Sequence, residues 1–112
     1  MTKDQILAMK PGIKLDMLIS EKVMNLRING KLKHYSQDIS AVWEVAEKMN
    51  ISVICSEDGW YAVVTDDIIH RHSHEHKYKE VYGKHWALAN NVPEAICKAA
   101  LCAVLDGGEE VE

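Results

Sequence analysis

Apolar side chains recur three and four positions apart in three stretches of the chain, residues 13–26, 39–49 and 93–105. This spacing places them on one side of an α-helix, so each stretch is predicted to form a helix with one buried face. Trp43 is therefore expected to be largely buried, with its ring supplying much of the packing. The predicted buried face of the middle helix consists of Ile39, Val42, Trp43, Ala46 and Met49.

Residues that favour helix ends stand at the borders of these stretches. Thr2 or Asp4 can cap a short additional helix, Gln5 to Met9, before Pro11-Gly12 interrupts the chain. The other expected boundaries are a cap at Ser36 or Asp38, a cap at Asn90 or Asn91 followed by Pro93 in the first helical position, and a break at Gly107-Gly108.

Two runs of β-branched and aromatic residues, Ile51 to Cys55 and Trp60 to Thr65, are predicted to pair as a hairpin around the loop Ser56 to Gly59. A third strand is expected from Ile68 to Glu75, and Lys79 to Tyr82 forms either a fourth strand or a loop. The predicted fold class is α+β, with an antiparallel sheet packed by helices. A chain of 112 residues is expected to form it as a single domain.

Composition and charge narrow the class of protein. With 47% hydrophobic and 27% charged residues, the chain has the balance of a globular domain. A net charge of −4 argues against a protein that coats nucleic acid through an overall positive field. No apolar run approaches the ~20 residues of a membrane span, and no signal peptide is recognised. A cytoplasmic location is therefore expected.

The segment from His70 to His76 is the strongest local anomaly, because it holds four histidines at alternate positions. On a strand, alternation brings His70, His72, His74 and His76 to one face. Such rings can bind a ligand or converge on a metal ion, although the segment lacks the cysteine or carboxylate spacing of a specific metal signature. A solvated strand face is the simplest interpretation, and ligand contact and metal binding remain as alternatives.

Basic and aromatic residues continue beyond the histidines, with Lys79, Lys84 and Trp86 the most informative. Cations beside flat rings can hold the phosphates and the base of a nucleotide. No glycine-rich phosphate loop accompanies them, and ordinary solvation explains the same pattern. The predicted ligand-binding residues are His70, His72, His74, Lys79, Lys84 and Trp86.

No catalytic motif is recognised. Asp66-Asp67 reads as a turn, because consecutive strand residues point to opposite faces. Cys55, Cys97 and Cys102 have no close zinc-type spacing, and we interpret them as reduced thiols in buried packing. An enzyme is therefore the less favoured interpretation, and no cofactor is expected.

Three segments resemble the phage ABA sandwich domain, a family of small phage and prophage proteins of Gram-positive bacteria. They are Met9-Lys10-Pro11-Gly12 with the following Leu15-Asp16 and Glu21 to Met24, the helix from Asp38 to Glu44, and the helix from Pro93 to Leu101. The resemblance implies an antiparallel sheet packed by helices, in a sandwich of α, β and α layers. The histidine run and the long connection before the last helix depart from the family pattern.

Two functional hypotheses follow. The first is a non-enzymatic phage or prophage protein, acting in the bacterial host as a homo-oligomer, that masks a host defence protein or sequesters a small anionic nucleotide signal. The second is a metal-binding protein or metal-dependent enzyme that uses the run from His70 to His76.

Overall fold

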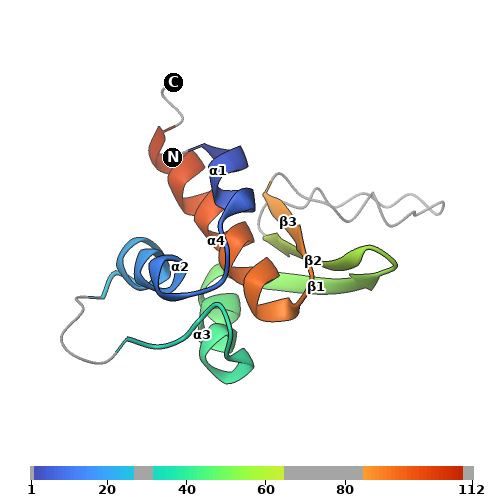
Figure 1. Ribbon diagram of the computed structural model, residues 1–112. Coiled ribbons are helices and arrows are strands. Elements are labelled where there is room, and N and C mark those ends of the chain that lie inside the picture. The colour runs from blue at the N-terminus through green and yellow to red at the C-terminus, as the bar shows by residue number, and fades with distance from the viewer. Residues whose placement is uncertain (1, 27–31, 65–84, 110–112) are drawn as a thin grey trace.

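The computed structural model describes residues 2–26, 32–64 and 85–109 (Figure 1). In chain order, the described elements are α1 (Lys3–Ala8), α2 (Ile13–Leu18), the π-helical turn η1 (Ile19–Val23), α3 (Ile39–Met49), β1 (Ile51–Ser56), β2 (Gly59–Val64), β3 (Trp86–Ala89) and α4 (Val92–Glu109). The predicted α+β class, with an antiparallel sheet packed against helices, is confirmed. None of the helices described is long and apolar enough to cross a membrane.

Helix α4 is the centre of the fold. It lies in the middle of the molecule and contacts all three strands as well as α1, η1 and α3 (Figure 1). Because neighbours surround it, the residues from Ala95 to Cys102 are buried without interruption, including one lysine, Lys98. The sequence predicted that this helix buries one face, whereas the structure buries it on all sides, as is typical of a helix inside a core.

The predicted caps are present. Thr2 and Gln5 form a reciprocal capping box at α1, and the Asp38 carboxylate accepts hydrogen bonds from the first amides of α3. The Asn91 side chain accepts from the Glu94 amide at 2.9 Å. Helix α4 begins at Val92, so Pro93 occupies the second helical position, where its missing N–H likewise has no intrahelical partner.

The prediction for the end of α4 is wrong. The helix continues through Gly107-Gly108 to Glu109. Glycine in a helix costs about 1 kcal/mol relative to alanine, which disfavours continuation without forbidding it.

The hairpin is confirmed, with a tighter turn than predicted. Strands β1 and β2 pair antiparallel from Ile51 opposite Val64 to Ser56 opposite Gly59, and β3 pairs antiparallel with the other side of β2. At Gly59, φ is +134°, and a Cβ there would lie 2.5 Å from the Ala89 carbonyl oxygen. Glycine is therefore required for both the backbone conformation and the close approach of β3.

The third strand of the described sheet is β3, which the sequence did not predict. Its four residues, Trp86–Ala89, are too few and too rich in alanine to give a strand signal. The strands expected at Ile68 to Glu75 and Lys79 to Tyr82 lie outside the described residues.

The expected burial of Trp43 is wrong. Its side chain is 51% exposed and that of Ile39 is 52% exposed, whereas Val42, Val45 and Ala46 are buried. Helix α3 presents the 42–45–46 side to α4, which rotates the buried face away from the predicted stripe. Trp43 is consequently a surface residue, and the large cost of truncating a core aromatic does not apply to it.

Two of the three cysteines follow the buried interpretation and one does not. Cys97 and Cys102 lie in the buried part of α4, while Cys55 on β1 is exposed. Burial raises the pKa of the Cys97 thiol well above its ordinary value of 9.0, and the nearby Asp16 carboxylate adds to the shift. The neutral thiol is thus the form that the folded core holds.

Stability is expected to fall as the pH rises from 9.0 to 10.0. Over this range Cys97 loses its proton in the unfolded chain but keeps it in the folded one, so unfolding releases a proton. The slope from this group approaches about 1.4 kcal/mol per pH unit. Denaturant titrations of wild type and Cys97→Ala measure it. The variant should show a shallower decline, and parallel curves would contradict the assignment. Tyr35, whose pKa burial also raises from 10.0, extends the loss to higher pH.

Candidate functional site

Of the six predicted ligand-binding residues, the structure describes one. His70, His72, His74, Lys79 and Lys84 lie outside the described residues, and Trp86 begins β3. The arrangement of these six residues around a common ligand therefore stays a prediction.

Trp86 lies in an aromatic and cationic cluster that sequence reasoning found only in part. Its ring centroid is 5.5 Å from that of Tyr61, with the planes inclined by 56°. The Lys3 ammonium lies 5.0 Å from the Trp86 ring centroid, a cation–π contact. We call Lys3, Tyr61 and Trp86 the aromatic cluster.

The register of the sheet explains why the two rings meet. Val63 pairs with Trp86, and Tyr61 pairs with Leu88, so Tyr61 and Trp86 are diagonal neighbours on one face. The alternate residues, among them Ala62 and Ala87, belong to the core on the face that packs against α4. The Tyr61 and Trp86 rings therefore belong to the sheet face directed away from α4, and Lys3 of α1 reaches Trp86 from outside the sheet.

Lys3 and Tyr61 were missed because neither stands near Trp86 in the sequence. Tyr61 could have been found from the alternation of β2, once its partner strand was known. Lys3 has no local signal, because only the packing of α1 against α4 brings it to the end of β3.

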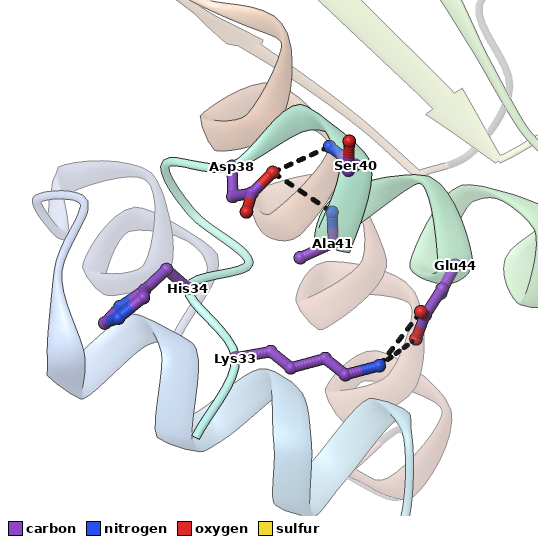
Figure 2. A pocket seen from close by; sticks show the side chains of 6 residues that line it. All are labelled: Lys33, His34, Asp38, Ser40, Ala41 and Glu44. Atoms are coloured by element: carbon purple, nitrogen blue, oxygen red, sulfur yellow. Dashed lines mark hydrogen bonds and ion pairs between the residues drawn. The ribbon is translucent and has the colours of Figure 1, made fainter. Parts of the chain in front are cut away.

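A second candidate is the shallow groove before and along the first turns of α3, lined by Lys33, His34, Asp38, Ser40, Ala41 and Glu44 (Figure 2). The Lys33 ammonium lies 2.9 Å from both carboxylate oxygens of Glu44, and this hydrogen bond raises the pKa of Lys33. An Asp38 carboxylate oxygen accepts from the amides of Ser40 at 2.8 Å and Ala41 at 3.3 Å. The charged groups of Lys33, Glu44 and Asp38 therefore already make hydrogen bonds or ion pairs within the protein.

Beside this groove, a buried carboxylate joins two segments. One oxygen of Asp16, on α2, accepts from the backbone N–H and the hydroxyl of Ser36, both at 2.7 Å. The other oxygen lies 3.5 Å from Nδ1 of the exposed His34 and has no hydrogen-bond partner among the described residues. The Ser36 oxygen also accepts from the Gly12 amide at 2.9 Å.

This cluster does not have the geometry of a catalytic triad. The Ser36 hydroxyl donates to Asp16, not to the imidazole, and Ser36 is fully buried. A nucleophilic serine needs its hydroxyl directed to the base and accessible to a substrate. The hydrogen bonds among Asp16, Ser36 and Gly12 therefore have a structural role: they attach α2 to the turn before α3. Within residues 2–26, 32–64 and 85–105, no group of three or more His, Cys, Asp or Glu side chains is arranged to hold a metal ion.

Comparison with known proteins identifies the family. The sequence model of the phage ABA sandwich domain matches residues 13–101, from the start of α2 to the middle of α4. The chain belongs to the phage ABA sandwich domain family. The resemblance seen in the sequence is thereby confirmed, and the matched residues include Asp16, Ser36 and Trp86.

A solved structure supports the same assignment. This phage ABA sandwich protein is similar to a phage protein from Bacillus cereus ATCC 14579, whose crystal structure gives a TM-score of 0.64 at 25% sequence identity. The alignment covers 88% of this chain and 90% of the Bacillus protein. No curated protein matches the sequence.

Proposed function

We propose that this protein is a non-enzymatic binding protein of a phage or prophage, and that it holds a small anionic nucleotide at the aromatic cluster. The observation that carries the proposal is the Lys3 ammonium 5.0 Å from the Trp86 ring, with Tyr61 packed beside it. A cation beside two flat side chains supplies both contacts that a nucleotide needs, ionic contact with its phosphates and stacking with its base.

The contacts suggest how such a ligand would enter. A base that stacks on Trp86 takes the ring face over which Lys3 now lies, and the displaced ammonium can then pair with a phosphate. Tyr61 borders the same ring and limits how the base can lie. Lys79 and Lys84, shortly before Trp86 in the sequence, are the further cations that we assign to the phosphates.

Membership of a phage protein family is the basis for the biological role that we propose. For a small phage protein in the cytoplasm of its bacterial host, holding a nucleotide suits the sequestration of a signal used in antiviral defence. Masking of a host defence protein by the same surface is the other role, and a failure to bind any nucleotide would favour it. The metal hypothesis depends on residues 70–76, outside the described residues, and no observation favours it over nucleotide binding.

Calorimetric titration with cyclic nucleotides and ADP-ribose derivatives tests the proposal. Trp86→Leu is expected to weaken binding about 5- to 150-fold, because base stacking on an aromatic side chain contributes ~1–3 kcal/mol. Lys3→Ala should weaken it less and reduce its salt dependence. Trp43→Leu is the matched control, since it removes an exposed tryptophan of α3 and should leave affinity unchanged. Equal losses in the two tryptophan variants would refute the site.

The histidine residues give a separate readout. Replacing His70, His72 and His74 together by Ala is expected to abolish any tightening of binding at mildly acidic pH, because imidazoles gain charge around pH ~6.5. If the triple variant binds with unchanged affinity and unchanged pH dependence, the three histidines do not belong to the site. The test of Trp86 is independent of that result.

A further inference from the structure

The outer edge of β1 combines three features of an interaction surface. Among the described strands, β1 lies at one end of the sheet order β1-β2-β3. Its six residues, Ile51–Ser56, include no charged side chain and no proline. They pair one to one with β2, so no bulge distorts the edge. Natural proteins protect edge strands with charges, prolines or bulges, and β1 has none of these.

The helix beside this edge exposes apolar side chains. Trp43 on α3 lies next to β1, and a shallow groove is lined by Trp43, Ala46, Glu47, Asn50, Ile51 and Ser52. Ile39 lies one turn before Trp43, and both side chains are about half exposed. A strand edge that has no neighbour among the described strands, with an exposed tryptophan beside it, fits a partner that adds a β-strand.

We propose that the partner is a second copy of this chain, joined by antiparallel pairing of β1 with β1. A two-fold axis through Val53 or Ile54 pairs the strand with itself and keeps side chains of each face on the same side. The described strands of the two copies then form one continuous sheet, and Trp43, which lies beside Ile51 and Ser52, comes next to the C-terminal end of β1 in the other copy.

The distribution of charge makes β1 a more favourable place for two copies to meet than the rest of this acidic protein. The net charge of −4 opposes contact between two copies in general. Between two β1 strands, however, no like charges stand opposite each other, because Ile51–Ser56 is uncharged.

The contact area sets the expected affinity. Trp43 and Ile39, each about half exposed, contribute on the order of 200 Å² of apolar surface per copy, since a whole aromatic side chain buries ~150–250 Å². A stable interface buries about 800 Å² per partner, so these two side chains supply only about a quarter of that area and the paired strand edges must add to it. We therefore expect a reversible dimer that forms at micromolar concentrations.

Sedimentation equilibrium from about 1 to 500 μM tests the proposal, across the range where small interfaces associate. Wild type should change from the 12.7 kDa monomer to twice that mass. Ile54→Lys should raise the dissociation constant at least about tenfold, because it places lysines near the axis. Leu88→Lys is the matched control, a lysine on the same sheet face at the opposite described edge, and should dimerise as wild type does.

Three further measurements complete the test. Trp43→Ser should also weaken the dimer, and circular dichroism should show that each variant keeps its fold. Amide hydrogen exchange in β1 should slow as the concentration rises. A wild-type protein that stays monomeric up to the highest concentration would overturn the proposal, and a host protein would then be the partner to test at this edge. A dimer that Ile54→Lys leaves intact would overturn it as well.

Discussion

Replacing Lys98 by Met is expected to lower the free energy of unfolding by about 3 to 5 kcal/mol, the usual cost of removing one partner of a buried ion pair. Lys98 is 3% exposed in the middle of the core. Its ammonium donates to the Leu7 carbonyl oxygen at 2.8 Å and to a Glu94 carboxylate oxygen at 2.5 Å. The substitution leaves that carboxylate, whose side chain is 13% exposed, without its cation.

Two controls separate the buried charge from lost packing. The double variant Lys98→Met/Glu94→Gln should recover part of the loss, because no unpaired charge then remains in the core. Lys33→Met breaks the exposed pair with Glu44 and should change stability little, since solvent screens such a pair. Denaturant unfolding measures all three. If Lys98→Met were as mild as Lys33→Met, the buried pair would not stabilise the fold.

The same contact connects distant parts of the chain. The Leu7 carbonyl belongs to the last turn of α1, so Lys98 ties α1 to α4. Helix α1 also carries Lys3, which lies over Trp86. Lys98→Met is therefore expected to loosen α1 and, through it, the cation of the aromatic cluster.

Asp16→Ala is expected to cost about 3 kcal/mol or more, because hydrogen bonds to a charged group contribute ~1.5–3 kcal/mol each and this carboxylate accepts two. Its removal leaves the buried N–H and hydroxyl of Ser36 without that acceptor. The turn before α3 would then lose its attachment to α2. Thermal and denaturant unfolding of the variant measure the loss.

Asp16→Asn is the matched control for the acceptor. An amide oxygen can accept both Ser36 hydrogen bonds, and the position of the second oxygen has no hydrogen-bond partner in the described residues. The loss in free energy of unfolding for Asp16→Asn should therefore be less than half of the loss for Asp16→Ala. Equal costs for Asn and Ala would show that the negative charge, and not the hydrogen bonds to Ser36, is what the fold requires.

Local chemistry in the sequence determined where most elements begin and how the hairpin forms. The caps at Thr2, Asp38 and Asn91 were predicted because each satisfies free amides within three residues of itself. The hairpin was predicted because its two β-rich runs flank a short turn that ends in Gly59. Neither inference needs a partner from a distant part of the chain. The family resemblance likewise rested on contiguous segments.

Tertiary structure alone decided which face of each helix is buried and which distant residues meet. Trp43 satisfied the helical spacing as well as Val45 did, but α4 covers the side of α3 that holds Val45. A strand as short as β3 is specified mainly by its pairing with β2, because an isolated strand of that length has little stability of its own. The contacts of Lys3 with Trp86, Lys98 with Leu7 and Asp16 with Ser36 join segments far apart in sequence, where spacing carries no information. Packing around α4 brings them together.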